Sequence, residues 1–148
     1  MLEDGEAAGS CTCGELRRAA RAVTLLYDNA TKYSGLLSTQ LGVLHLVSES
    51  DSKISDLAEE LGMDRTTLTR NLSVLERQGL IKISSGKDHR TRIVTITTKG
   101  RNSLAKAVPL WNQVQRKVKQ QMGENAWSEL MRNLSHFMKV ADQLNESK

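Results

Sequence analysis

One short segment of the chain, residues 65–71, concentrates side chains that could hydrogen-bond to nucleic acid. It holds six guanidinium, hydroxyl or amide groups: Arg65, Thr66, Thr67, Thr69, Arg70 and Asn71. Arginine and threonine near the N-terminal end of a helix are the residues that reach base edges in a major groove. Four of the six are expected to contact bases: Arg65, Thr66, Thr69 and Arg70. Thr67 and Asn71 could contact bases or phosphates, and the alternative for Thr66 or Thr67 is that it only caps the helix.

Charged residues form a second group in residues 82–92. Arg90 lies in a polar segment where a guanidinium could enter a minor groove, attracted by its negative potential. Asp88 is close enough in sequence to hold that guanidinium through a charge-assisted bond. Contacts to the phosphate backbone are expected from four further residues: Lys82, Lys87, Arg92 and Lys99.

Positive charge is concentrated around these two groups. Residues 64–101 contain nine Lys or Arg and three Asp or Glu, a balance of +6. The whole chain carries +4, so the remainder carries −2. This distribution indicates a surface that faces phosphates, although a solvated charged face would give the same pattern.

Cys11 and Cys13 are the two cysteines of the chain, and both precede the first expected helix. The positive end of a helix dipole favours a thiolate, so the pair could be a redox sensor. One thiol would be oxidised and then bridged by the other or by a cysteine of a partner subunit. The alternative, which we favour, is a pair of ordinary reduced thiols in a reducing compartment.

Nothing in the sequence indicates catalysis, a metal or a cofactor. His45, His89 and His136 are scattered singly, and two cysteines one residue apart supply too few ligands for zinc. There is no nucleophile arrangement and no glycine-rich phosphate loop. We therefore expect neither an enzyme nor a cofactor-binding protein.

A helix-turn-helix is needed to position the first group. Apolar residues at 3.6-residue spacing predict a helix over 54–61, and Gly62 can adopt the left-handed conformation that ends it. Asp64 is a good N-cap for a second helix over 65–78, the recognition helix. Its leucines would face inward and leave the polar residues outward.

A β-hairpin is needed to position the second group. β-branched runs at 81–85 and 92–97 predict two strands, joined by a polar and basic tip at 86–91. A hairpin directly after a recognition helix is the wing of a winged helix-turn-helix.

The wing resembles that of the multiple-antibiotic-resistance regulator (MarR) family. The family pattern is Asp-x-Arg-Ser/Thr and then a strand ending Leu-Thr-x-x-Gly. The matching residues are Asp88-His89-Arg90-Thr91 and Val94-Thr95-Ile96-Thr97-Thr98-Lys99-Gly100, with Ile96 in place of leucine. The similarity extends to the end of the recognition helix, Leu75-Glu76-Arg77-Gln78-Gly79-Leu80. The order of the expected helices and strands also fits the family from about residue 14 to the end.

The resemblance implies a dimeric DNA-binding regulator with a small effector, often phenolic or anionic, between the dimerisation helices and the DNA-binding lobe. Tyr27, His45 and Trp111 could lie near such a cleft or only pack in the core. Some members sense oxidants through an N-terminal cysteine.

Helices are also expected on both sides of the winged helix-turn-helix. Their predicted ranges are 14–32, 38–49, 98–122 and 124–145, after a loose arm over residues 1–13. Ser38 and Thr98 are the expected N-caps of two of them, and Pro109 should kink the helix that contains it.

The apolar stripes of helices 14–32, 98–122 and 124–145 are too long for one winged-helix core to cover. A homodimer would bury them, and the alternative is that they close a monomeric bundle. The expected interface residues on the last helix are Leu130, Leu134, Phe137 and Leu144.

The sequence therefore predicts a mainly α fold with a small β-wing (α+β), in a single domain over 1–148. Residues 37–100 would form the winged helix-turn-helix lobe, and 1–36 and 101–148 the dimerisation helices. The predicted function is a cytoplasmic, sequence-specific regulator, a repressor of palindromic double-stranded DNA operators that is released by a small molecule or an oxidant. The alternative is a winged-helix protein–protein interaction module. No apolar run is long enough for a membrane helix.

Overall fold

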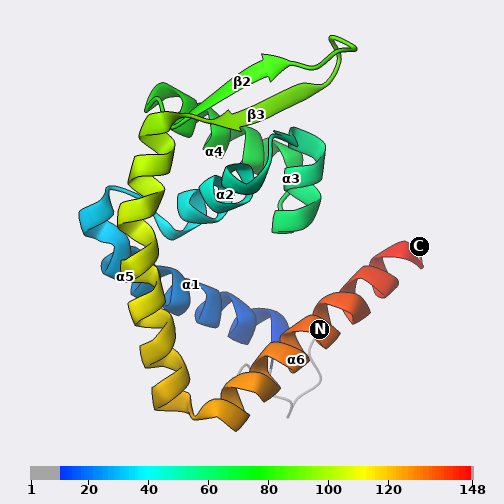
Figure 1. The fold of residues 1–148 in the computed structure, drawn as a ribbon. Coiled ribbons are helices and arrows are strands. Elements are labelled where there is room, and N and C mark those ends of the chain that lie inside the picture. Colours follow the sequence, from blue (N-terminus) through cyan, green and yellow to red (C-terminus); the bar gives the residue numbers. More distant parts are fainter. Residues whose placement is uncertain (1–10, 148) are drawn as a thin grey trace. The chain divides into compact units, whose positions relative to one another are not determined.

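The computed structural model describes residues 11–147, and the chain divides into two compact units, Met1–Trp111 and Asn112–Lys148. Most of the loose arm expected over residues 1–13 lies outside the described residues. Among those that are described, the first unit contains the winged helix-turn-helix (Figure 1). Its helices are α1 (Thr12–Thr31), the 3-10 helix η1 (Lys32–Ser34), α2 (Ser38–Glu49), α3 (Ile54–Leu61), α4 (Arg65–Arg77) and the start of α5 (Thr98–Met122).

The turn between α3 and the recognition helix α4 forms as the sequence predicts. Gly62 has a φ of 61°, and its amide donates to the carbonyls of Ala58 and Glu59, which ends α3. Asp64 then caps α4, because its carboxylate accepts a hydrogen bond from the amide of Thr67 at 2.9 Å. These two local signals confirm the predicted boundary between the helices.

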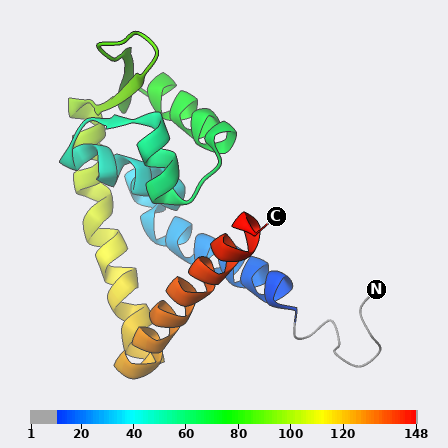
Figure 2. The same ribbon diagram turned by 90° about the vertical axis from the view of Figure 1, so that its right-hand side faces the viewer.

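The sheet has three antiparallel strands in the order β1-β3-β2. β2 (Ile81–Ser85) and β3 (Arg92–Ile96) form the predicted hairpin, with Ile81 opposite Ile96 and Ser85 opposite Arg92. This hairpin, called the wing below, extends away from helices α2–α4 in Figure 1 and in the turned view of Figure 2. β1 (Ser52–Lys53) was not predicted, since two residues in a Ser- and Asp-rich loop show no alternation.

The core of the first unit fixes the rotation of α4 about its axis. Leu68, Leu72 and Leu75 are completely buried, as predicted, and pack in one cluster with Leu44 and Leu57 and with residues of the sheet. Because these leucines hold one stripe of α4 inward, the opposite stripe is forced outward. The polar residues of α4 therefore face solvent.

Two predicted N-caps are wrong by one residue. Leu37, not Ser38, caps α2, and the Gln40 side-chain oxygen accepts a hydrogen bond from the Leu37 amide at 3.0 Å. Thr97, not Thr98, caps α5, because its hydroxyl oxygen accepts from the amide of Gly100 at 3.0 Å. In each case the residue that was expected to cap is the first residue inside the helix.

The second unit contains the end of α5 and the helix α6 (Glu124–Glu146). Gly123, with a φ of 83°, separates them, and the Lys119 ammonium lies 3.9 Å from the centre of the Trp127 ring. α5 is continuous through Pro109, so the expected kink stays a prediction. Within residues 11–147, no helix is both long enough and apolar enough to span a bilayer.

Candidate nucleic-acid interface

The outer face of α4 carries the residues expected to contact bases. The exposed side chains on this helix include all four: Arg65, Thr66, Thr69 and Arg70. Asn71 is half-buried. The Thr69 hydroxyl donates to the carbonyl of Arg65 at 2.7 Å, so its proton is used within the helix while its oxygen can still accept a hydrogen bond. The face thus offers two guanidinium groups and two threonine side chains.

Thr67 belongs to the cap of α4. Its hydroxyl donates to Asp64 at 2.5 Å and its amide donates to the same carboxylate at 2.9 Å. These two bonds, the hydroxyl bond first, lower the pKa of Asp64 below its ordinary value of 3.8. The capping alternative therefore holds for Thr67, whose hydroxyl proton is engaged within the protein.

The tip of the wing is organised by Asp88. One of its carboxylate oxygens accepts from the amides of Thr91 at 3.0 Å and Arg90 at 3.3 Å, and the other from the Thr91 hydroxyl at 2.8 Å. These bonds, chiefly those from Thr91, lower the pKa of Asp88 below its ordinary value of 3.8. No ion pair among the described residues joins Asp88 to Arg90. The prediction that Asp88 holds the guanidinium was wrong, because its oxygens bind the turn instead.

Two further backbone features close this turn tightly. The Gly86 amide donates to the Thr91 carbonyl at 2.6 Å, and the His89 amide donates to the Gly86 carbonyl at 3.1 Å. His89 adopts a positive φ of 57°, which is uncommon for a residue with a side chain. A Cβ at Gly86 would lie 3.2 Å from that of Thr91, so glycine fits best there. The turn leaves the side chain of Arg90 exposed.

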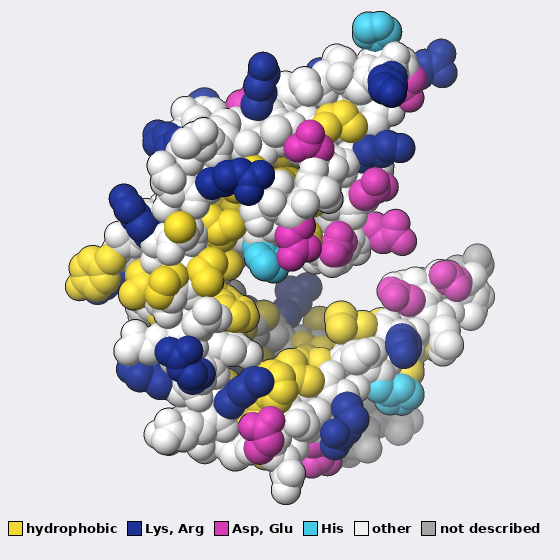
Figure 3. All heavy atoms as spheres, in the orientation of Figure 1, with side chains coloured by type: hydrophobic (Ala, Val, Ile, Leu, Met, Phe, Trp, Pro, Cys, Tyr) yellow, Lys and Arg dark blue, Asp and Glu magenta, His cyan; other side chains and the backbone are white. Residues whose placement is uncertain are grey.

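Basic side chains surround the wing tip. Figure 3 shows Lys and Arg side chains gathered at this end of the hairpin. The exposed basic residues of the wing are Lys82, Lys87, Arg90 and Arg92. Lys99, expected to contact phosphate, instead donates from its ammonium to the carbonyl of Gln78 at 2.6 Å.

Glu76 links the recognition helix to the wing. Its carboxylate accepts a hydrogen bond from the amide of Ile83, on β2, at 3.0 Å. The bond helps to fix where the wing begins relative to α4. Sequence reasoning missed this residue, because a glutamate on an exposed helix surface gives no sign of a partner seven residues away.

Cys11 and Cys13 are both exposed free thiols at the start of α1. Cys11 is the N-cap residue, and its carbonyl accepts from the amide of Glu15 at 2.9 Å. Its sulfur lies over the first turn, 4.0 Å from where a Cβ on Gly14 would be. Solvent oxidants can therefore reach both thiols.

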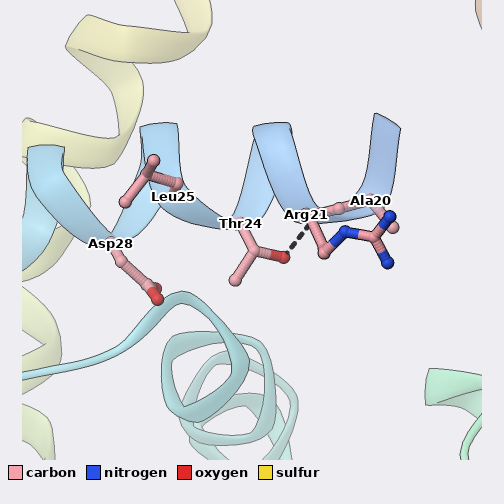
Figure 4. Close-up of a pocket in the computed structure, with 5 residues that line it drawn as sticks. All are labelled: Ala20, Arg21, Thr24, Leu25 and Asp28. Carbon is pink, nitrogen blue, oxygen red and sulfur yellow. Dashed lines mark hydrogen bonds between the residues drawn. The ribbon is translucent and has the colours of Figure 1, made fainter. Parts of the chain in front are cut away.

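Shallow hollows lie on one face of α1 and on one face of α6. Figure 4 shows the first, lined by Ala20, Arg21, Thr24, Leu25 and Asp28. The second is lined by Met131, Arg132, Ser135, His136 and Lys139. Neither includes the expected effector-site residues: Tyr27 packs against Trp111 with 5.8 Å between ring centres, and His45 is exposed, 3.8 Å from Glu49.

Apolar side chains are exposed on α1 and α6, two of the three helices expected to dimerise. On α1, the exposed fractions are 48% for Val23 and 63% for Leu25. On α6, Phe137 and Leu144 are 40% and 67% exposed, Leu130 is also exposed, and Leu134 is half-buried.

Among residues 11–147, no group of three His, Cys, Asp or Glu residues is arranged to hold a metal ion.

Comparison with known proteins gives one family match and many structural matches. A model of the MarR family matches residues 34–91. The DNA complex of the Mycobacterium tuberculosis transcriptional regulator MosR is 41% identical, with a TM-score of 0.84 over 90% of this chain and 97% of that one. A second MosR structure is 39% identical, with a TM-score of 0.81 over 93% and 99% of the two chains.

A third structure shows the same fold at lower identity. The repressor CouR, of Rhodococcus jostii RHA1, bound to a 23-mer DNA duplex is 24% identical, with a TM-score of 0.78 over 93% of this chain and 99% of that one. No curated protein matches the chain.

Proposed function

Because the chain belongs to the MarR family of transcriptional regulators, we propose that it represses genes by binding palindromic double-stranded DNA operators as a homodimer. It is a regulator and not an enzyme. In the proposal, residues 37–100 form the DNA-binding lobe, while residues 1–36 and 101–148 contain the dimerisation helices. A small molecule or an oxidant releases the DNA.

The observation that carries the proposal is the joint exposure of the α4 outer face and the wing tip. Leu68, Leu72 and Leu75 are buried on one side of α4, while Arg65 and Arg70 are exposed. An exposed helix with two arginines beside a basic hairpin is suited to a major groove and the adjacent minor groove. Two of the structures that resemble this chain, one of MosR and one of CouR, are complexes with DNA.

Each group has a distinct role in the proposed complex. Arg65, Thr66, Thr69 and Arg70 read base edges, where a guanidinium can bind the two acceptors of guanine and a threonine methyl group can contact thymine. Arg90 enters the minor groove from a turn that Asp88 holds in shape. The phosphate backbone is neutralised by Lys82, Lys87 and Arg92, which adds affinity but no sequence information. Thr67 and Asn71 lie at the edge of the surface that contacts DNA.

The homodimer is supported by the exposed apolar residues of α1 and α6. A monomer that left Leu25, Phe137 and Leu144 in water would lose hydrophobic free energy and would tend to associate. Two copies related by a two-fold axis place two recognition helices about one DNA turn apart, which matches a palindrome.

Release of DNA requires a signal that binds or modifies one arrangement of the dimer more favourably than the other. A small molecule could do so only through a difference in affinity for the two arrangements. An oxidant could act at Cys11 or Cys13, which are exposed at the start of α1. We favour the small molecule, because exposed thiols in a reducing compartment are by default reduced.

The alternative function, a protein–protein interaction module on the same fold, is less well supported. A basic hairpin with an exposed arginine at its tip fits the negative potential of a minor groove. The family to which the chain belongs consists of transcription regulators. Retention on heparin that falls steeply with salt would favour the DNA-binding function further.

Selection of bound fragments from genomic DNA, followed by sequencing, tests the proposal. We expect the recovered fragments to share an inverted repeat with half-sites about 10 base pairs apart between centres. Light scattering on the same preparation should give the mass of a dimer. Recovery of fragments without any shared sequence would reject sequence-specific regulation and favour the interaction module.

A further inference from the structure

The C-terminal end of α4 is held by the residues at the start of α5. Three successive carbonyl oxygens, those of Gln78, Gly79 and Leu80, each accept a hydrogen bond from residues 97–99. The Lys99 ammonium donates to Gln78 at 2.6 Å. Thr97 donates twice, through its hydroxyl to Gly79 at 2.6 Å and through its amide to Leu80 at 3.1 Å.

The Thr97 side chain forms hydrogen bonds both to the chain after α4 and to the first turn of α5. Its hydroxyl donates to Gly79, and the same oxygen accepts from the amide of Gly100 at 3.0 Å. Its carbonyl accepts from the amide of Arg101 at 2.9 Å. Thr97 therefore caps the first turn of α5 while it fixes the chain that leaves α4.

The two segments also approach too closely for any residue larger than glycine at position 100. A Cβ on Gly100 would overlap the carbonyl oxygen of Leu80. The backbone of α5 thus lies directly against the chain that follows α4. The three hydrogen bonds and this contact form one joint, which we call the α4–α5 joint (Gln78–Leu80 with Thr97–Gly100).

Lys99 is engaged at the end of α4 where its positive charge is most favourable. The last carbonyls of a helix carry the negative end of its dipole, and Lys99 binds the carbonyl of the residue just after the last turn. This bond uses one of the three donors of the ammonium and ties the Lys99 side chain to the end of α4. Lys99 therefore has a partner inside the protein, at the end of the recognition helix.

We propose that Thr97 and Lys99 are positioning residues, which fix the tilt of α4 for base reading without touching DNA. This inference rests on the proposed DNA-binding function. Leu68, Leu72 and Leu75 hold α4 by apolar contacts, which are not directional. Hydrogen bonds are directional, and base contacts tolerate displacements of only about 0.5 Å. The α4–α5 joint supplies that directional constraint at one end of the helix.

The test compares Lys99→Met and Thr97→Val with the wild type on two duplexes. One duplex is the strongest binder recovered by selection from a random-sequence library, and the other is a scrambled duplex of equal length and composition. Thr97→Ser keeps the hydroxyl, and Lys106→Met removes an exposed charge elsewhere on α5. For each protein, the affinity for both duplexes and the slope of log affinity against log salt are measured, together with the thermal unfolding midpoint.

Loss of positioning should weaken binding to the selected duplex by about tenfold in both variants, roughly the effect of one lost hydrogen bond. Binding to the scrambled duplex and the salt slope should not change, since no phosphate contact is removed. Thr97→Ser and Lys106→Met should behave as wild type.

Three results would overturn the inference. Unchanged affinity of Lys99→Met and Thr97→Val for the selected duplex would mean that the α4–α5 joint does not affect base reading. Equal losses on both duplexes, with a salt slope lower by about one, would make Lys99 a phosphate contact. Equal losses with an unchanged slope and a lower unfolding midpoint would indicate a structural role only. If the wild type itself prefers no duplex, the proposed function fails and not merely this inference.

Discussion

Asp88 accepts hydrogen bonds from both the amide and the hydroxyl of Thr91, at 3.0 and 2.8 Å, and so shapes the turn that presents Arg90. The carboxylate acts on the backbone of the wing tip, and the guanidinium is left free to reach a groove. A change at Asp88 should therefore affect the turn, and a change at Arg90 should affect the contact with DNA.

Arg90→Ala should weaken binding to the selected operator by about 1–3 kcal/mol and leave folding and dimerisation intact. The reason is that Arg90 is exposed and shapes no part of the turn through its side chain. A mobility-shift titration measures the effect, with Arg116→Ala, an exposed arginine of the second unit, as control. Unchanged affinity in a folded, dimeric variant would reject the wing as a DNA contact.

The carboxyl of Asp88 should titrate below its ordinary pKa of 3.8, because the bonds from Thr91 favour its charged form. A lowered folded-state pKa means that the stabilisation is present above pH 3.8 and is lost as the pH falls through the folded pKa. NMR titration of the carboxyl carbon measures this directly. Thr91→Val should bring the midpoint back toward 3.8; equal midpoints in both proteins would contradict the capping role.

Phe137→Arg or Leu134→Arg should convert the dimer to monomers or aggregates and abolish operator binding, since a buried, unpaired charge at an interface is costly. Ser135→Arg is the matched control, because it adds the same charge about 100° around the helix from Leu134. Light scattering reports the mass. A native dimer in both test variants would refute the assignment of this stripe to the interface.

Peroxide should leave operator binding unaltered, because we expect Cys11 and Cys13 to be bystanders and a small molecule to be the signal. The check is the affinity of the wild type before and after oxidation, beside Cys11→Ser and Cys13→Ser. An oxidant-dependent loss of binding in the wild type that either substitution removes would reverse this assignment and make the thiols the sensor.

Sequence signals were sufficient where the structure is decided locally. Gly62 and Asp64 set the start of α4 through bonds within three or four residues, and the leucine spacing of α4 set its buried face. The strands at 81–85 and 92–96 could likewise be predicted from their own alternating pattern and from the polar turn between them.

Sequence reasoning failed where a side chain had several partners within reach. Asp88 was paired with the guanidinium of Arg90, yet its oxygens accept hydrogen bonds from the amides of the turn. The bond from Lys99 to Gln78 was not foreseen, because it depends on two segments 21 residues apart meeting in the fold. The dimer interface and the effector site stay predictions, because they depend on a second chain or a ligand.

The most direct test of the account repeats the selection of random DNA duplexes with Arg65→Ala and Arg70→Ala beside the wild type. If these exposed residues of α4 read base edges, each variant should lose its preference at one or two base pairs of every half-site, worth about 1–3 kcal/mol. Preferences at the other positions should be retained. A recovered sequence identical to that of the wild type in both variants would contradict base reading by α4.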